Sequence, residues 1–368
     1  MTKITAEVLL PTRNLTEDIG FFTKVLRFRM EMIYPADDPA VAVFSGHGLR
    51  VRLDRNLDMP PGTVRLLCED PQELAKGQTA LNSPGGTRIE IEARDKPLVL
   101  PDTMHGFVVR RLADQAPWVI GRAGMHYRDL IPDRLGGSII ASHIRIPDGG
   151  PVPDMVHYHD VGFQLIYCYR GWVDLVYEDQ GPPFRLHAGN CVIQPPKIRH
   201  RVLFASDNIE VIEIGVPAEH VTTIDHEMEL PTGMAKPDRL FAGQRFVHHK
   251  AHEAEWRPFR LSGYEARDTT ICDNTQGVAG VQVARPDGKT SGWVRHDGDI
   301  LFTFVLDGAF TLEGEGRDPH RLTSGDAFVI PPGMATRYAD PTADLALLEV
   351  ALPGQFETAE VAANAQRV

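Results

Sequence analysis

The sequence of 368 residues predicts a mainly β fold, in which an α+β unit precedes two related β units. Three observations lead to this prediction. Glycine (33 residues) and proline (28) are abundant, which is typical of many turns between short strands. The first part of the chain combines one clear helical pattern with strand patterns. The part after about residue 124 repeats its own short motifs at a nearly constant spacing.

Composition narrows the class of protein. Acidic residues (50) outnumber basic residues (38), and the net charge of −12 disfavours binding to a nucleic-acid backbone. None of the four cysteines forms a C-x-x-C pair, so neither a thiolate zinc site nor a disulfide framework is predicted. The sequence has no apolar run of signal-peptide or membrane-spanning length. We therefore expect a cytoplasmic protein with a small-molecule substrate and neither a nucleic-acid nor a membrane partner.

The first predicted unit covers residues 1–115. After a strand at 4–11, Asn14 or Thr16 can cap a helix with Glu17 in its first turn. The apolar face of that helix consists of Ile19, Phe22, Val25 and Leu26. Three strands are then expected at 30–34, 41–45 and 49–53, which gives a β-α-β-β-β unit. A second, weaker unit is expected from a strand at 64–68, a helical piece at 71–75 and strands at 88–93 and 107–111.

The stretch from Ile19 to Leu26, IGFFTKVL, resembles the glyoxalase or vicinal-oxygen-chelate family. Members of that family bind a metal through His and Glu on a cupped sheet. The resemblance places the following residues at the ligand positions: Glu7, Arg50 or Arg52, Thr63, and Glu90 or Glu92. Because an arginine beside a cation is electrostatically unfavourable, we expect a degenerate module that serves as structural support, a dimerisation surface or a substrate lid.

The remainder of the chain contains an internal repeat. Arg128-Asp129 recurs 139 residues later as Arg267-Asp268, and Pro147-Asp148-Gly149 recurs with the same offset. Gly189 and the following Pro195-Pro196 recur 136 residues later as Gly325 and Pro331-Pro332. A shared period with small drifts indicates two homologous β units that differ by short loop insertions.

A cluster of potential metal ligands lies in the first repeat. His157 and His159 alternate on one face of a strand, while Tyr158 is on the other face. Gln164 falls on the next strand, and His200 follows Pro195-Pro196. Three imidazoles and one side-chain oxygen can converge on one divalent ion. Imidazole suits zinc, iron, nickel and copper, so the residue types leave the metal open.

These residues resemble the two motifs of the cupin superfamily. The motif G-x5-H-x-H-x3,4-E-x6-G matches residues 150–171, and G-x5-P-x-G-x2-H matches residues 189–200. Gln164 replaces the usual glutamate, and Lys197 replaces a turn glycine. The resemblance implies two cupin barrels (double-stranded β-helix or jelly roll, RmlC-like). It places barrel 1 with a metal at 116–220, an inter-barrel segment at 221–260, barrel 2 at 261–355 and a tail at 356–368.

The second repeat lacks the same ligand set. At the equivalent positions His157 becomes Val294, Gln164 becomes Leu301 and His200 becomes Thr336, while only His159 keeps its counterpart, His296. A single imidazole holds a transition metal poorly. We therefore expect a bicupin with one metal-binding barrel and one structural barrel.

Three functions remain open from the sequence. The favoured one is a dioxygenase acting on a small organic acid, enol or aromatic compound, with Fe(II) as the favoured metal and zinc, nickel or manganese as alternatives. The second is an oxygen-independent isomerase or lyase, and the third is a non-catalytic binding protein. Candidate catalytic residues are His143, Arg145 as a carboxylate ligand, and Tyr158. Ile166 and Cys168 should face inward with Gln164. A homodimer is the default assembly.

Overall fold

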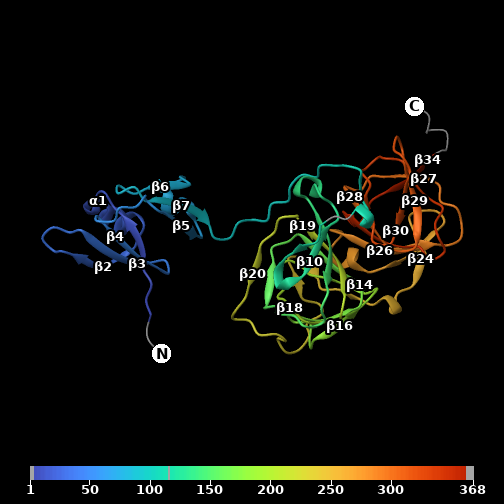
Figure 1. The fold of residues 1–368 in the computed structure, drawn as a ribbon, viewed down its shortest axis with the longest axis horizontal. Coiled ribbons are helices and arrows are strands. Elements are labelled where there is room, and N and C mark those ends of the chain that lie inside the picture. The colour runs from blue at the N-terminus through green and yellow to red at the C-terminus, as the bar shows by residue number, and fades with distance from the viewer. Residues whose placement is uncertain (1–3, 115–116, 362–368) are drawn as a thin grey trace. The chain divides into compact units, whose positions relative to one another are not determined.

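A computed structural model describes residues 4–114 and 117–361 and confirms a mainly β chain (Figure 1). The chain divides into two compact units, Met1–Pro97 and Leu98–Val368. Each unit is described by itself. Among the described residues, no helix has the length and hydropathy needed to cross a membrane.

The first unit begins with the predicted β-α-β-β-β arrangement. Strand β1 (Val8–Pro11) leads into helix α1 (Leu15–Gly20), which continues as a π-helical turn, η1 (Phe21–Val25). The Asn14 side chain caps α1 by accepting a hydrogen bond from the backbone N–H of Glu17. The sheet has the order β1-β4-β3-β2, in which the other strands are β2 (Arg29–Tyr34), β3 (Val41–Gly46) and β4 (Leu49–Asp54).

The apolar face of this helical segment packs onto the sheet. Phe22 and Leu26 are fully buried and Ile19 is partly buried, as the periodicity predicts, whereas Val25 is exposed. The same core extends to a second sheet of order β5-β7-β6. Its elements are β5 (Thr63–Cys68), α2 (Pro71–Ala75), β6 (Ala80–Asn82) and β7 (Arg88–Ala93).

Ion pairs occupy the surfaces of the two sheets where the family resemblance places metal ligands. Arg50 donates to the carboxylate of Glu7 at 2.8 Å, and Arg65 donates to Glu90 at 2.8 Å. Each of these carboxylates therefore already has a cationic partner within the unit. Thr63 is exposed at the beginning of β5.

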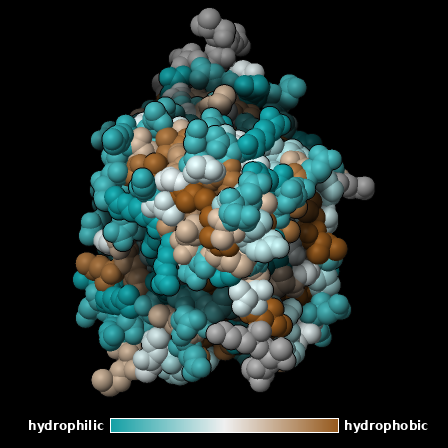
Figure 2. Space-filling view, turned by 90° about the vertical axis from the view of Figure 1, so that its left-hand side faces the viewer, coloured by the Kyte–Doolittle hydropathy of each residue, from teal (hydrophilic) through white to brown (hydrophobic). Residues whose placement is uncertain are grey.

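The edge strand β2 of this unit is exposed along its whole length. Its apolar side chains at Met30, Met32, Ile33 and Tyr34 all reach solvent. On the side of the molecule that faces the viewer in Figure 2, brown apolar patches interrupt a largely hydrophilic surface. Exposed apolar strands at a sheet edge favour association. Dimerisation therefore stays a prediction for this unit, beside structural support and a substrate lid.

The second unit contains two barrels, each made of two facing sheets (Figure 1). In barrel 1 the larger sheet has the order β23-β17-β14-β19-β11-β10-β9 and the smaller has the order β16-β15-β18-β13-β20. The larger sheet comprises β9 (Val119–Ile120), β10 (His126–Asp129), β11 (Ile140–Ile146), β14 (Phe163–Arg170), β17 (Cys191–Ile193), β19 (Ile209–Val216) and β23 (His248–His249). The smaller comprises β13 (His157–His159), β15 (Trp172–Tyr177), β16 (Phe184–His187), β18 (His200–Ala205) and β20 (Thr222–Ile224), and β12 (Gly150–Pro151) pairs with β18.

Barrel 2 repeats this topology except for β12, which has no counterpart among the described residues. Its larger sheet has the order β24-β25-β26-β33-β28-β31-β8, and its smaller sheet has the order β30-β29-β32-β27-β34. The larger sheet comprises β8 (Val108–Arg110), β24 (Trp256–Pro258), β25 (Tyr264–Asp268), β26 (Gly280–Pro286), β28 (Ile300–Asp307), β31 (Ala327–Val329) and β33 (Ala346–Leu352). The smaller comprises β27 (Trp293–His296), β29 (Ala309–Gly314), β30 (His320–Thr323), β32 (Thr336–Ala339) and β34 (Thr358–Val361).

The segments outside the barrels join them in ways that the sequence does not predict. Strand β34 lies within the expected tail, of which residues 362–368 are outside the described residues. The expected inter-barrel segment supplies β20 and β23 to barrel 1 and β24 to barrel 2, and between them β21 (Leu240–Phe241) and β22 (Gln244–Arg245) form a hairpin. In the described part of the unit, four short 3-10 turns and one helix lie between the strands: η2 (Leu112–Asp114), η3 (Arg122–Gly124), η4 (Arg134–Gly137), η5 (Ala251–Glu253) and α3 (Ile271–Asn274).

The two barrels exchange strands. Strand β8 precedes barrel 1 in the chain but pairs with β31 of barrel 2, and β23 precedes barrel 2 but pairs with β17 of barrel 1. The segment 107–111, which the sequence assigns to the N-terminal unit, therefore completes barrel 2. Edge strands need a partner, and each barrel obtains one from the segment that leads into the other.

The repeated Arg-Asp motif lies at the junction of the barrels. Arg128 donates to the backbone carbonyl of Gly325 in barrel 2, and its counterpart Arg267 donates to the carbonyl of Gly189 in barrel 1 at 3.1 Å. One apolar core spans both larger sheets, so that Phe163 and Phe302, for example, belong to the same cluster. The barrels are thus held back to back by shared burial and by reciprocal hydrogen bonds.

Candidate metal centre

Three histidines meet inside barrel 1. His157 and His159 lie on β13, and β13 pairs with β18 in a register that places His157 directly opposite His200. The ring centroids of His157 and His200 are 4.2 Å apart, and those of His159 and His200 are 5.2 Å apart. One ligand nitrogen from each ring lies within 4.8 Å of the others. Strand alternation and strand pairing therefore bring together all three predicted imidazoles.

Hydrogen bonds orient each of these rings. The Nδ1 atom of His157 is 2.7 Å from the carbonyl oxygen of Met155, and that of His200 is 3.0 Å from the carbonyl of Ile198. Because a carbonyl only accepts, both Nδ1 atoms carry a proton and both Nε2 atoms keep a free lone pair. The buried Nε2 atom of His157 has no hydrogen-bond partner. These outer contacts prepare the rings to bind a metal through Nε2.

Burial keeps the triad neutral. It lowers the pKa of His159 to about 3, with a smaller contribution from the neighbouring His157. Burial also lowers the pKa of His157 and places that of His200 well below its ordinary value. A metal binds the deprotonated imidazole, so these rings need not lose a proton at neutral pH.

Gln164 has the environment of a buried ligand. It lies on β14 and is fully buried, and its Nε2 donates to the Glu213 carboxylate at 2.7 Å. Its Oε1 atom is buried without a hydrogen-bond partner. An unpartnered buried carbonyl is costly unless something else satisfies it, and a bound cation would do so. The donor set of three neutral imidazoles and one amide oxygen therefore fits a divalent transition metal.

The centre adjoins a cavity of about 320 Å³ inside barrel 1. His159 and His200 form part of its wall together with Ile166, which faces inward as predicted, and with many other aliphatic side chains. Cys168 also faces inward as predicted, in an apolar cluster that includes the cavity residue Ile144, and burial raises the pKa of its thiol to about 12. A thiol of that kind is unreactive at neutral pH.

His143 and Arg145 do not face this cavity. On β11 the cavity is lined by Ile140, Ser142 and Ile144, so the intervening residues point out of the barrel. His143 is buried at the junction of the barrels, where its Nε2 lies 2.7 Å from the Glu210 carboxylate. Its ring also packs against Phe304 of barrel 2. His143 and Arg145 thus share one face of β11, and that face points away from the cavity.

Tyr158 and Arg145 have outward contacts. Tyr158 projects from the opposite face of β13 to the histidines, and the Arg199 guanidinium lies 4.4 Å from its ring centroid. Arg145 donates to the side chain of Asn208 at 2.9 Å. Neither side chain reaches the cavity, so the three catalytic candidates from the sequence all lie outside it.

Glu213, His220 and Arg122 are three of the polar cavity residues that the sequence interpretation missed. Glu213 on β19 lines the cavity, and burial raises the pKa of its carboxyl. His220 and Arg122 also line it. The repeat contains a signal for Glu213, because this charged residue in an apolar strand recurs 136 residues later as Glu349. Arg122 lies on η3, outside the strand alternation, and no pattern identifies it.

Lys197 occupies the position of the turn glycine. Its backbone adopts a left-handed conformation (φ +62°), as does its barrel 2 counterpart Gly333 (φ +79°). This conformation favours glycine, so the turn before His200 keeps its geometry with a less suitable residue. The Lys197 ammonium forms an ion pair with Asp160 at 3.2 Å.

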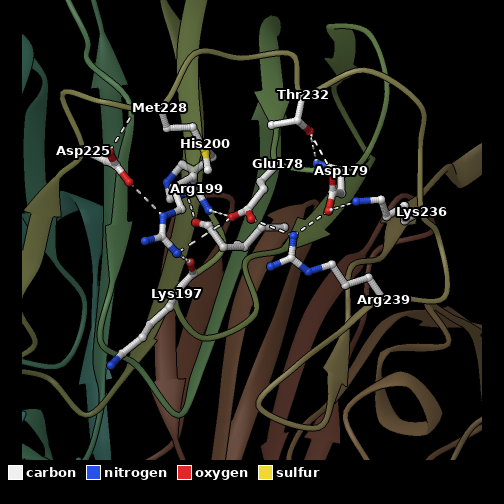
Figure 3. A network of polar contacts seen from close by, with 11 residues as sticks. Glu178, Asp179, Lys197, Arg199, His200, Asp225, Met228, Thr232, Lys236 and Arg239 are labelled. Atoms are coloured by element: carbon white, nitrogen blue, oxygen red, sulfur yellow. Dashed lines mark hydrogen bonds and ion pairs between the residues drawn. The ribbon is translucent and has the colours of Figure 1, made fainter.

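A polar network fastens the segment that follows β20 (Figure 3). Arg199 reaches Asp225 at 3.1 Å on one side and Glu178 on the other. Arg239 donates to the carboxylates of both Glu178 and Asp179. Within β20 itself, the Thr222 hydroxyl lies 2.9 Å from Nδ1 of His159, so the network anchors the strand that supports this ring.

Barrel 2 has a different interior. Val294 pairs with Thr336 in the register that His157 and His200 use in barrel 1. The Nε2 atom of His296 lies 3.1 Å from the carbonyl oxygen of Ile330. Among the described residues, the triad in barrel 1 is the one group of three or more His, Cys, Asp or Glu side chains with metal-binding spacing.

Comparisons with known proteins agree with the fold. Residues 280–350 match the family model of the Cupin domain. A single-residue variant of the oxalate decarboxylase of Bacillus subtilis aligns with a TM-score of 0.52 and 12% identity, covering 71% of this chain and 82% of that chain. The salicylate 1,2-dioxygenase of Pseudaminobacter salicylatoxidans aligns with a TM-score of 0.52 and 14% identity, covering 72% and 90%. No curated protein matches significantly in sequence.

These findings define a protein with the cupin fold. The family match falls on barrel 2, and barrel 1 has the same strand order. Oxalate decarboxylase from Lactobacillus farciminis in complex with formate aligns over 72% of this chain and 92% of its own, with a TM-score of 0.53 and 12% identity. The chain is thus similar in fold to these enzymes over 71–72% of its length. At these identities the likeness concerns the fold.

Proposed function

We propose that this chain is a metal-dependent cupin enzyme, in which barrel 1 binds one divalent transition metal and acts on a small organic acid, enol or aromatic substrate. The observation that carries the proposal is the convergence of His157, His159 and His200, neutral and oriented through Nδ1, beside a largely apolar cavity. Gln164 is the proposed fourth ligand. Structural barrels do not need three buried imidazoles with free lone pairs.

The cavity fits a small substrate. Its volume of about 320 Å³ is at the lower end for ligand pockets, and its largely aliphatic wall would accommodate an aromatic ring or enol. A bound metal would supply Lewis acidity and, if redox-active, the means to activate O2. The apolar wall would exclude water and strengthen electrostatic interactions inside the cavity.

Arg122 is the proposed anion-binding residue, in place of Arg145. Its guanidinium forms an ion pair with the buried carboxylate of Asp154, which fixes it at the cavity wall. The remaining N–H groups can then donate to a substrate carboxylate or enolate. The names of the similar structures refer to oxalate and salicylate, both carboxylates, which supports an acidic substrate.

An oxygen-independent lyase or isomerase is the second candidate. The neutral donor set favours it, because a site with zinc or nickel and an amide ligand needs no redox change. The similarity to oxalate decarboxylases agrees with this candidate as much as the similarity to a dioxygenase agrees with the first. A protein that binds its ligand without turnover is the third.

Metal analysis and oxygen uptake separate these candidates. The purified chain is analysed for bound metals and then assayed with catechols, β-diketones and hydroxy acids in an oxygen electrode. Stoichiometric iron with substrate-dependent uptake of O2 is the expected result. Turnover without oxygen would favour the second candidate, and ligand binding without turnover would favour the third. A chain that retains no divalent metal after loading would contradict the whole proposal.

A further inference from the structure

Glu213 is hydrogen-bonded to the proposed ligand Gln164, although the two residues are far apart in the sequence. The Gln164 Nε2 donates to Oε1 of Glu213 at 2.7 Å, while the Gln164 Oε1 is buried and unpartnered. A carboxylate only accepts hydrogen bonds, so the amide must present its NH2 end to Glu213. Its carbonyl oxygen is therefore held on the side away from Glu213.

The second barrel shows what happens to the same carboxylate when no such partner is present. Glu349 is the counterpart of Glu213, because Glu213 lies opposite Ile166 in the β14–β19 pair and Glu349 lies opposite Thr303 in the β28–β33 pair. Gln164 is replaced there by Leu301, which cannot donate. Instead Arg260 enters the barrel and donates to both oxygens of Glu349, one at 2.8 Å.

The charge balance of the two barrels therefore differs. In barrel 2 the carboxylate is neutralised by a guanidinium whose side chain is only 13% exposed. In barrel 1, among the residues that the structure describes, no Lys, Arg or His side chain forms an ion pair with Glu213, and the nearby Arg122 pairs with Asp154. An enclosed carboxylate without a cationic partner is unfavourable, and a divalent ion beside it would restore the balance.

We infer that Glu213 is a positioning residue of the metal centre, which aims the Gln164 carbonyl oxygen at the histidine triad and supplies, one hydrogen bond away, the negative charge that an amide ligand lacks. This inference rests on the proposed metal site in barrel 1. The usual glutamate of the motif is then not simply lost, because its charge lies on the neighbouring strand β19. Carboxylates behind metal ligands act in this way, by fixing the ligand and increasing its basicity.

The test measures metal affinity, not activity. Co(II) is titrated into metal-free full-length protein in competition with a chelator, and the visible absorption of the bound ion reports its coordination. Glu213→Gln, which is isosteric and neutral, should bind Co(II) about 10- to 100-fold more weakly than wild type. The exchanged pair Gln164→Glu/Glu213→Gln restores a carboxylate and an amide in reversed order, and it should regain most of the lost affinity.

Glu210→Gln is the matched control, because it removes the same charge from the same strand on the face away from the cavity. Its affinity should stay within about threefold of wild type, an expectation that follows if outer-shell contacts and not net charge set the affinity. Wild-type affinity in Glu213→Gln, or an exchanged pair no better than that single variant, would overturn the inference. If Glu213→Gln does not fold, the exchanged pair alone decides. A wild-type protein that binds no metal would instead refute the proposed function.

Discussion

The buried ion pair of barrel 2 allows a quantitative prediction. Arg260 and Glu349 have side chains that are 13% and 5% exposed, and the guanidinium contacts both carboxylate oxygens. Removing one partner leaves the other charge buried and alone, which costs about 3–5 kcal/mol in comparable pairs. Arg260→Met keeps much of the aliphatic stem, so the loss should reflect the charge more than the packing. We expect a loss of free energy of unfolding in that range.

A double-mutant cycle identifies the source of this loss. Arg260→Met/Glu349→Met replaces both charges by apolar side chains and should be no more than about 1–2 kcal/mol less stable than wild type, because no isolated charge remains. Urea unfolding of the full chain, followed by the tryptophans of the second unit, gives the values. Arg295→Met is the control, because the Arg295–Glu315 pair is 41% and 43% exposed and should contribute less than about 1 kcal/mol. A single Arg260 variant as stable as the control would refute the reasoning.

Three further predictions concern barrel 1. His157→Ala should abolish stoichiometric metal in elemental analysis, whereas His296→Ala should retain it; a large loss in His296→Ala would contradict the assignment of one metal-binding barrel. Since the pKa of His159 is about 3 when folded and 6.5 in the reference state, this residue alone should cost the metal-free protein about 1.6 kcal/mol between pH 6.5 and pH 5, because the unfolded chain takes up the proton. Urea unfolding after chelation should show at least this slope, and His159→Gln should reduce it without abolishing it, because burial also lowers the pKa of His157 and of His200. Arg122→Met should raise KM for an acidic substrate at least tenfold with unchanged metal content; an unchanged KM would argue against its role.

Local sequence patterns predicted most elements of the first unit, because helix caps and the periodicity of apolar side chains depend on residues close together in the sequence. The Asn14 cap, the burial of Phe22 and Leu26 and the strands β2 to β5 agree with the sequence to within one residue at most ends. The strand at 107–111 was also found, as β8, but it was assigned to the wrong neighbour. Alternation predicts that a segment is a strand. It contains no information about which edge, far along the chain, the strand will join.

The three histidines of the candidate metal centre were predicted, whereas the other polar cavity residues were not. His157 and His159 share one strand, so their common face follows from the alternation of side chains, and the motif spacing adds His200. His143 shows the limit of that reasoning. Both faces of β11 are buried, one against the cavity and the other against barrel 2, so an apolar pattern cannot distinguish them. Arg122 could not be found because it reaches the cavity from a turn.

The internal repeat is preserved where the barrels meet and lost where the metal would bind. Arg128 and Arg267 each donate to a glycine carbonyl of the opposite barrel, so each copy of the motif depends on the opposite barrel for its partner. Strands β8 and β23 are exchanged in the same way, since each pairs with a strand of the barrel that it does not lead into. A change at this junction would disturb both barrels, whereas a change of ligand affects one interior only. The second barrel can therefore hold Leu301 and the Arg260–Glu349 pair in its interior, without the histidine cluster, and still support the first.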